Sequence, residues 1–308
     1  MKDLFLLSTL LFVLFSCEKK TNYFPVDITN TIPPNNLIYY TSTDGNIVTP
    51  KEPTAFGAEL ISNEYVNGKG TLTFDGDVTS IGKTAFSKCS NLFSISLPKS
   101  VTSIRNASFQ SCTELTSIRI PESVTTIGDG AFDCCFALMS ITIPNSIKRI
   151  PPVLFCDCSS LTDIIIPNSV TIIETGAFSG CSGLKSITIS ESVTIIGSSA
   201  FVACSSLSNV NIPNRVISIG DNAFQDCSSI TNITIPESVI RMGAGAFYNC
   251  TGLLSITMLP ATPPVTEGYS FDNTNSAPIY VPAESIADYK TARNWSLYAD
   301  RIKAINEQ

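Results

Sequence analysis

Apolar residues recur along most of this chain with a 23-residue period. Phenylalanine occupies positions 86, 109, 132, 155, 178, 201, 224 and 247, and a cysteine follows each of them at the third position after it. A third column, three positions further on, holds leucine in seven copies and Ile230 in the other. Columns that stay in phase over eight copies indicate a repeat protein, in which each unit buries its apolar side chains against the next.

Each unit reads Ile-Gly-x-x-Ala-Phe-x-x-Cys-x-x-Leu-x-x-Ile-x-Ile-Pro-x-Ser-Val-x-x. The Ile-x-Ile segment alternates with a period of two, which predicts a short strand with one buried face, for example at Ile118–Ile120 and Ile141–Ile143. The following Val-x-x-Ile predicts a second extended segment, and Ala-Phe-x-x-Cys-x-x-Leu has helical or 3₁₀ spacing. The predicted fold is a repeat solenoid, a leucine-rich-repeat-like stack of 23-residue coils with short parallel β-strands and short helical or extended segments, capped at both ends.

Both ends of the repeat array carry different patterns. One period before Ile95 lies Leu72, and one period after Ile256 lies Ile279, so ten strand rungs are predicted. Upstream, the Asp44-Gly45 pair between two short apolar runs predicts a β-hairpin. Downstream, residues 284–295 lack proline and glycine and predict a helix. We therefore expect an N-terminal cap with a β-hairpin at 37–70, the solenoid at 71–282 and a C-terminal capping helix at 283–308.

The chain begins with an apolar run over residues 4–15. This run is shorter than the roughly 20 residues that span a bilayer, so residues 1–16 are expected to form a signal peptide. It ends in the sequence LFSC, which resembles a bacterial lipobox, and Cys17 is therefore expected to carry lipid. The polar, proline-bearing residues 17–36 suit a flexible tether. The expected location is the outer membrane, lipid-anchored on the extracellular side; a plain secretory signal and a periplasmic orientation are the alternatives.

Composition and charge exclude several classes of function. The net charge is −7, whereas nucleic acid requires a basic surface, so no nucleic-acid partner is expected. The chain has no histidine, the residue most used in acid–base catalysis and a frequent metal ligand. No phosphate-binding loop, nucleophile elbow or zinc pattern occurs. We therefore expect no catalytic residue, no metal and no cofactor, and predict that the chain is not an enzyme.

Two repeated columns carry side chains capable of chemistry. The eight in-phase cysteines stand between the phenylalanine and leucine columns, which predicts buried small apolar residues rather than disulfides or metal ligands. Cys134 and Cys156 fall outside that column, and a bond between them is one hypothesis. A serine recurs at the turn, at positions 100, 123, 146, 169, 192 and 238. Six equivalent serines suggest hydroxyls that bond the adjacent coil, not a catalytic residue.

The repeat resembles the BspA-type leucine-rich repeats of bacterial surface proteins over about residues 71–282, for instance in IGDGAF at 127–132 and ITIPNS at 141–146. The flanks IYYT at 38–41 and IYVP at 279–282 also resemble those of such proteins in Bacteroides-like bacteria. Members of this family are associated with adhesion to host matrix proteins and to other bacteria. The resemblance therefore implies the solenoid fold and a protein ligand, such as an extracellular matrix protein or another bacterial surface protein.

Ligand binding is expected at the outward strand positions, where repeats three and four depart from the usual residues. There, Phe136 replaces a serine or threonine, Ile165 replaces a polar residue, and Lys148-Arg149 interrupts the usual turn. Exposed aromatic, aliphatic and basic residues together are typical of interface centres. The predicted binding site consists of Arg119, Phe136, Thr142, Lys148, Arg149, Ile165 and Thr188. A solvated β-surface without a ligand is the alternative.

The predicted function is that of an adhesin-like cell-surface protein that recognises a host or bacterial protein through an extended solenoid face. One alternative is a glycan-binding accessory lipoprotein of the outer membrane, which clustered exposed aromatic residues would favour. The other is a passive architectural surface protein. The sequence does not name the ligand.

Overall fold

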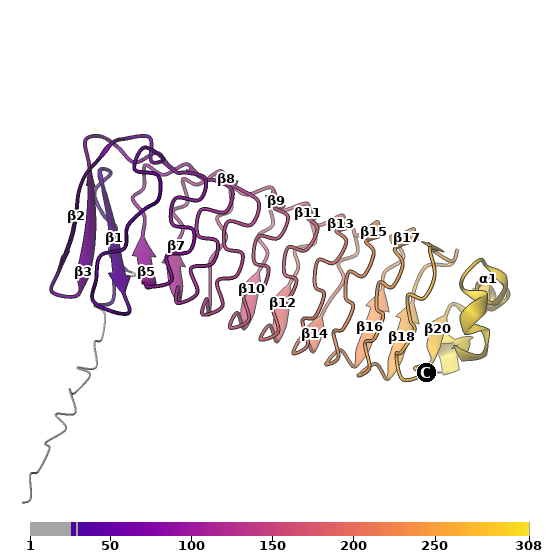
Figure 1. Cartoon of the computed structure of the whole chain (residues 1–308). Helices are drawn as coiled ribbons and strands as arrows, with labels where there is room; N and C mark the ends of the chain where they lie inside the picture. The colour runs from indigo at the N-terminus through magenta and orange to yellow at the C-terminus, as the bar shows by residue number, and fades with distance from the viewer. Residues whose placement is uncertain (1–25, 29, 308) are drawn as a thin grey trace, which may run out of the picture.

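The computed structural model describes residues 26–28 and 30–307. The described chain is an elongated solenoid with a cap at each end (Figure 1). The predicted fold is confirmed, since successive 23-residue coils stack through short parallel strands. In this described part of the chain, no helix is long and apolar enough to cross a membrane. The predicted signal peptide, Cys17 and the start of the predicted tether lie outside the described residues.

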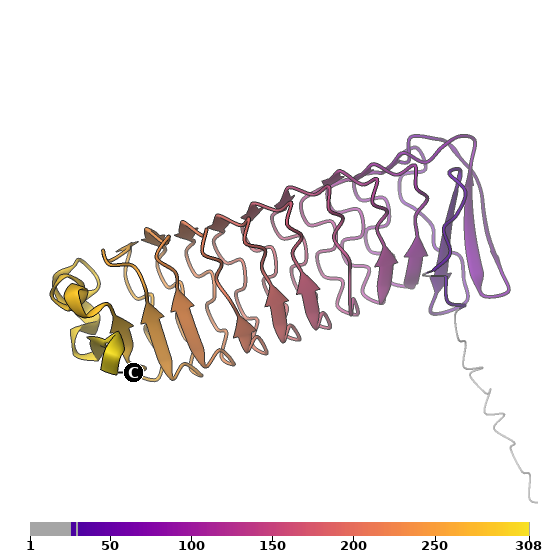
Figure 2. The same cartoon turned by 180° about the vertical axis from the view of Figure 1, so that it is seen from behind.

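Two sets of strands run along the solenoid, on different sides (Figures 1 and 2). The outward side of one set is called the strand face, and it comprises β5 (Leu92–Ser96), β7 (Ser117–Arg119), β10 (Asp163–Ile165), β12 (Ser186–Thr188), β14 (Asn209–Val210), β16 (Asn232–Ile235), β18 (Ser255–Met258) and β20 (Ile279–Val281). The outward side of the other set is called the second face, and it comprises β4 (Ser80–Ile81), β6 (Ser103–Ile104), β8 (Thr126–Ile127), β9 (Arg149–Ile150), β11 (Ile172–Ile173), β13 (Ile195–Ile196), β15 (Ser218–Ile219), β17 (Arg241–Met242) and β19 (Val265–Thr266).

Both ladders are interrupted between the second and third coils, and the strand-face ladder is interrupted again between β14 and β16. The strand predicted at Ile141–Ile143 is not formed, and an isolated bridge between Ser117 and Ser140 takes its place. On the second face, β8 and β9 belong to different sheets at the same step. The predicted alternation of burial nevertheless holds, because Ile141 and Ile143 are buried and Thr142 is exposed. Side-chain packing therefore continues through a step where the backbone ladder does not.

The third wall of each coil, called the turn wall, is built from consecutive turns, so the predicted helical or 3₁₀ segment is absent there. In the first repeat, Cys89 N donates to Phe86 O within the coil at 3.0 Å. Between these two residues, Lys88 N instead donates to Gln110 O of the next coil at 2.7 Å. A helix would keep such amides within its own segment. Sharing them between coils satisfies the backbone and ties neighbouring repeats together.

These turns require a left-handed backbone at two positions of every repeat. The first column with positive φ contains Thr84, Ala107, Gly130, Val153, Gly176, Ser199, Asn222 and Gly245, and the second contains Lys88, Ser111, Cys134, Asp157, Gly180, Ala203, Asp226 and Asn249. Glycine and asparagine tolerate this conformation, whereas a β-branched residue is strained in it. Thr84 and Val153, with φ angles of 57° and 48°, are the β-branched residues in these two columns.

Replacing Val153 by glycine is expected to raise the free energy of unfolding by about 1 kcal/mol, because glycine removes the left-handed strain at a partly exposed position. Urea denaturation of the purified chain measures this change. The matched control is Val202→Gly, where φ is not positive and the same substitution should lower stability by about 1 kcal/mol. Equal losses in the two variants would contradict the strain argument.

The core contains a continuous stack of phenylalanine rings. From Phe86 to Phe271, neighbouring ring centroids lie 5.1–5.8 Å apart with interplanar angles of 1–23°. Phe271 extends the column by a ninth ring that the 23-residue period misses, because one extra residue separates it from Phe247. Offset stacking of this kind adds to the gain from burying each ring.

The cysteine and serine columns have the structural roles predicted for them. All eight column cysteines are buried, and seven donate their thiol hydrogen to a phenylalanine carbonyl of the preceding coil at 3.0–3.3 Å. Ser100, Ser123 and Ser238 each donate to a valine carbonyl of the preceding coil at 2.7 Å, and Ser146 makes the same bond. The hydroxyl of Ser169 is buried without a hydrogen-bond partner among the described residues.

The N-terminal cap differs from the predicted one. Strand β1 (Leu37–Ser42) pairs antiparallel with both β3 (Lys69–Phe74) and β5, so β3 is not stacked on β5 as a first rung. The hairpin expected at Asp44-Gly45 is also absent. Instead, β2 (Leu60–Val66) and β3 form a hairpin around Asn67-Gly68, whose two positive φ angles match the turn that joins two-residue hairpins. An antiparallel strand thus covers the first edge of the parallel ladder.

The C-terminal cap is made of several short elements rather than one helix. These are η1 (Ala283–Ser285), α1 (Ile286–Thr291), η2 (Ser296–Arg301), β21 (Ile302–Ala304) and η3 (Ile305–Glu307). The predicted helix ends early because Ala292 is extended and Asn294 has a φ of 67°. Ile302 pairs with Ile279, one period away, so β21 adds a rung that was not predicted. Trp295 closes the core against Phe271, and its Nε1 donates to Pro264 O at 2.7 Å.

Candidate functional site

The strand face is open over most of its length. Arg119, Thr142, Ile165 and Thr188 occupy its outward position in four successive coils and are all exposed, as the sequence predicted. In the first coil the equivalent residue, Ser96, is buried, because its hydroxyl donates to Thr31 O of the N-terminal segment. The uncovered surface therefore begins at Arg119.

A cavity of about 650 Å³ lies at the start of this open surface. Asn30 and Ile32 of the N-terminal segment form one side of it, together with Lys99. The rest of the lining comes mainly from two coils: Ser117, Ile118, Arg119, Ile120, Pro121, Glu122 and Ser123 from the first, and Ser140, Ile141 and Thr142 from the second. These coils are the ones joined by a single bridge, so the cavity coincides with the interruption of the ladder. Its lining combines two cations, Lys99 and Arg119, with the carboxylate of Glu122, hydroxyl groups and aliphatic carbon.

Large apolar side chains are exposed beside this cavity and one coil beyond it. Phe136 is 45% exposed and Ile165 is 72% exposed, at the positions that the sequence marked. Met139, which is 57% exposed, is not among the residues that the sequence analysis singled out. Five of the other seven coils carry a polar residue at its repeat position, whereas the first and the last carry Phe93 and Leu254. Exposed apolar residues of this size, bordered by polar ones, are typical of interaction surfaces.

Lys148 and Arg149 do not belong to the same surface. They lie at β9 on the second face, around a corner from Thr142, so the seven predicted residues do not form one patch. Arg149 is also engaged by neighbouring coils, with Nη1 at 2.7 Å from Glu174 Oε1 and Nη2 at 4.0 Å from Asp129 Oδ1. Lys148 and Arg149 are close to Thr142 in sequence but not in space, because the turn at 144–147 separates the two faces.

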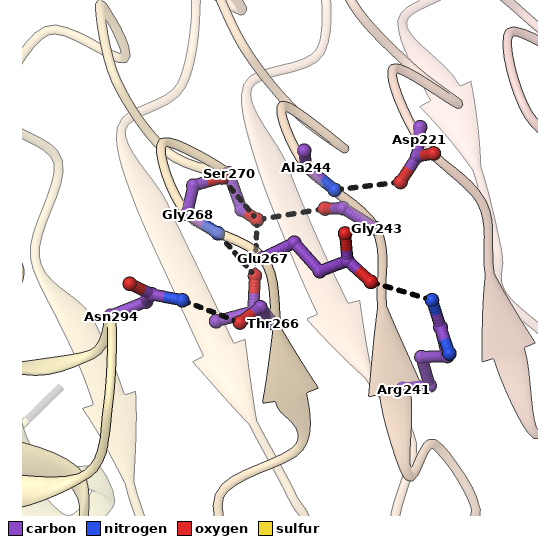
Figure 3. Close-up of polar contacts among 9 residues, drawn as sticks. All are labelled: Asp221, Arg241, Gly243, Ala244, Thr266, Glu267, Gly268, Ser270 and Asn294. Atoms are coloured by element: carbon purple, nitrogen blue, oxygen red, sulfur yellow. Dashed lines mark hydrogen bonds and ion pairs between the residues drawn. The ribbon is translucent and has the colours of Figure 1, made fainter.

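The second face has features of its own. A shallow cavity of about 320 Å³ follows the glycine column and is bordered by Asp221 and Arg241. Close by, Arg241 Nη2 lies 2.7 Å from Glu267 Oε1, and Asp221 Oδ1 accepts a hydrogen bond from Ala244 N at 2.9 Å (Figure 3). The second face also carries four exposed aliphatic residues that the sequence analysis did not single out, Ile195, Ile217, Ile240 and Val265.

The remaining contacts of this region join the last coils to the cap. Ser270 Oγ bonds Thr266 Oγ1 at 2.7 Å and donates to Gly243 O at 3.0 Å (Figure 3). Asn294 of the cap donates to Thr266 O at 2.7 Å. These polar groups bond one another across successive coils, which indicates a structural role rather than a reactive one.

The family comparison agrees with the repeat pattern. The model of the BspA type leucine rich repeat region matches six copies, over residues 79–205 and 176–291. Together these ranges cover more than half of the chain. The chain belongs to this family. The resemblance inferred from the repeat is therefore confirmed. Arg105, Pro151 and Glu174 stand where the other repeats have glycine, and they are variations within a BspA-type array.

Several solved structures are similar to this BspA-type protein. A leucine rich cell surface protein from Faecalibacterium prausnitzii is 35% identical, with a TM-score of 0.45 over 59% of this chain and 57% of its own. A leucine rich repeat protein from T. pallidum is 31% identical, with a TM-score of 0.44 over 59% of this chain and 74% of its own. One from Bacteroides ovatus is 19% identical, with a TM-score of 0.33 over 80% of this chain and 91% of its own.

All three TM-scores are below 0.5, so these structures support no conclusion about function. The match to the Faecalibacterium prausnitzii protein covers 57% of the length of that protein. No curated protein sequence matches the chain. A leucine-rich-repeat solenoid is a scaffold type of fold, so the function of this BspA-type protein has to be argued from its surfaces.

The repeated thiols of this BspA-type solenoid are unsuited to nucleophilic chemistry. Burial raises the pKa of Cys89 from 9.0 to about 11 and that of Cys250 to about 12. A nucleophilic cysteine needs the opposite shift, toward a thiolate at neutral pH. The cysteine column therefore contributes packing and hydrogen bonds, and the open surfaces are the candidates for function.

Proposed function

We propose that this protein is an adhesin-like binding protein, displayed at the cell surface, that recognises a protein ligand across its strand face. The observation that carries the proposal is the open surface from Arg119 onward. It starts with a cavity and presents an exposed isoleucine, Ile165, two coils further on. Successive coils lie about 4.8 Å apart, so a ligand that contacts four of them spans about 14 Å. Solenoids commonly bind through extended surfaces of this kind.

The chemistry of the strand face favours a protein over other ligands. On this face Ile165 offers an apolar anchor, and Arg119 and the threonines supply hydrogen bonds. Phe136 and Met139 are exposed on the segment that leads into the third coil's part of the face. Protein interfaces combine such anchors with a polar rim. An acidic chain suits a protein partner better than nucleic acid, whose phosphates would be repelled.

The proposed location follows from the N-terminal sequence. Lipid on Cys17 would hold the protein at the outer membrane, and the polar residues that follow would act as the tether to the folded part. With the anchor at the N-terminal end, the open strand face would extend away from the membrane, where a host or bacterial surface protein can reach it.

The experiment measures binding of residues 18–308 to immobilised fibronectin, fibrinogen and a glycan panel at physiological salt. The proposal predicts saturable binding to a protein, with a dissociation constant in the micromolar range or tighter. Binding to glycans alone would assign the surface to carbohydrate instead. Absence of binding to every member of the panel would remove the case for adhesion and leave a passive architectural role.

A further inference from the structure

Four side chains with metal-binding atoms meet on the turn wall, away from the strand face. Asp133 and Cys134 lie in one coil, and Cys156 and Asp157 lie in the next. The 23-residue register places Cys156 over Asp133 and Asp157 over Cys134. The two segments are joined directly, because Cys134 N donates to Cys156 O at 2.8 Å. Donor atoms of Asp133, Cys134 and Asp157 therefore gather at the surface, and Cys156 contacts this group through Asp157.

The distances in this cluster suit a tetrahedral metal ion. Cys134 Sγ lies 3.3 Å from Asp133 Oδ1 and 4.0 Å from Asp157 Oδ2, and Cys156 Sγ lies 3.7 Å from Asp157 Oδ2. Donor atoms of Asp133, Cys134 and Asp157 all fall within 4.8 Å of one another. Zinc bonds of about 2.3 Å to sulfur and about 2.0 Å to oxygen place such atoms about 3.5 Å apart. Small side-chain movements would bring these three residues around one ion, and Cys156 would have to turn toward it as the fourth donor.

Neighbouring residues orient the two carboxylates. Gln110 Nε2 donates to Asp133 Oδ2 at 2.8 Å, which leaves Oδ1 facing the thiol of Cys134. Asp157 Oδ1 occupies space that only glycine leaves free, because a Cβ on Gly180 would lie 2.1 Å from this oxygen. Hydrogen bonds and packing that fix metal ligands in this way are a regular part of protein metal sites.

The charge of the cluster also favours a cation. The thiol of Cys134 lies between two carboxylates, with Sγ 3.3 Å from Asp133 Oδ1 and 4.0 Å from Asp157 Oδ2. A divalent cation at this place would attract both carboxylates, and its binding would remove the thiol proton.

We propose that Asp133, Cys134 and Asp157, with Cys156 as the fourth donor, bind one zinc ion or a similar thiophilic divalent cation. On binding, each coordinating thiol releases its proton to solvent, so the affinity rises with pH. The sequence-level expectation of no metal rested on the absence of histidine and of a known ligand spacing, and neither consideration covers ligands that adjacent coils bring together. This site is independent of the proposed adhesion.

The test is a titration of the reduced protein, spanning residues 18–308, with Zn²⁺ against a chromophoric chelator and with Co²⁺. We expect one equivalent of tight binding, and visible and thiolate charge-transfer absorption from bound Co²⁺. The double variant Cys134→Ser/Cys156→Ser should lose both. These replacements are conservative, because Ser111 and Ser179 occupy the same two repeat positions in neighbouring coils.

A matched pair of aspartates separates metal binding from general charge effects. Asp157→Asn should weaken Zn²⁺ binding at least tenfold. Asp226→Asn should leave it unchanged, because Asp226 has the same repeat position and contacts Gln225 and Asn249 rather than a thiol. Retained binding in the cysteine variant, equal losses in the two aspartate variants, or no stoichiometric binding would overturn the proposal. A Cys134–Cys156 disulfide in protein isolated without reductant would also do so.

Discussion

Raising the pH from about 8 to about 10 is expected to unfold the solenoid in the presence of a reductant. Burial raises the pKa of Cys89 from 9.0 to about 11 and that of Cys250 to about 12, and it raises those of the other six column thiols well above 9.0. The unfolded chain therefore releases protons that the folded chain retains. The stability that these thiols contribute is present below pH 9 and is lost as the pH rises above it.

The size of this effect comes from repetition. At one pH unit above its unfolded pKa, each buried thiol costs about 1.4 kcal/mol. Eight such thiols cost on the order of 10 kcal/mol, which is comparable to the whole stability of a typical domain. No single thiol would have this consequence, whereas a column of them makes the fold sensitive to alkali.

Urea denaturation at several pH values measures this dependence. In the control variant Cys204→Ala/Cys227→Ala, two of the eight column thiols are absent, so the slope of unfolding free energy against pH above 9 should fall by about a quarter. The variant loses some packing as well, but that loss is the same at every pH. A slope that does not change when thiols are removed would contradict the account.

Replacing Phe178 by alanine is expected to lower the free energy of unfolding by about 3–5 kcal/mol. Phe178 lies in the middle of the ring stack, with centroids at 5.4 Å from Phe155 and 5.3 Å from Phe201, and it is fully buried. Removing the ring leaves a cavity and interrupts the stack, so both neighbours lose contacts. The rigid coils on either side limit how far this cavity can collapse.

The same urea experiment measures this loss. The control is Ile165→Ala on the strand face, where the side chain is 72% exposed and the change should be within about 0.5 kcal/mol. Phe178→Leu should fall between the two, since it keeps part of the buried volume. Similar losses for Phe178→Ala and Ile165→Ala would contradict the assignment of the ring column as the core.

The repeat could be predicted in detail because each buried column repeats the same physical constraint. The period fixed which side chains point inward, and those columns are buried along the solenoid, with Val210 only partly buried. The caps were harder, because they do not repeat. The pairing of β1 between β3 and β5 joins segments distant in sequence and leaves no period to detect. The sequence contains two hairpin signals, Asp44-Gly45 and Asn67-Gly68, and only the second forms a hairpin.

The candidate sites, like the fold, could be predicted from the sequence only in part. The exposure of Arg119, Thr142 and Ile165 followed directly from strand alternation. Alternation alone does not say where the chain turns onto another face, so Arg149 was grouped with them although it lies on the second face. The cluster around Cys134 could have been found by aligning adjacent repeats, since the register alone puts Asp157 over Cys134. Its distances and supporting hydrogen bonds required the structure.

The measurement that tests the proposed function most directly compares the two faces against one protein ligand. Arg119→Glu/Ile165→Asp changes the strand face, and Arg241→Glu/Ile240→Asp makes the same changes on the second face, where both residues are also exposed. The account predicts that the strand-face variant binds at least tenfold more weakly, a loss of about 1.4 kcal/mol or more, while the second-face variant binds like the unchanged chain. Equal affinity of all three proteins, or a loss confined to the second-face variant, would contradict it.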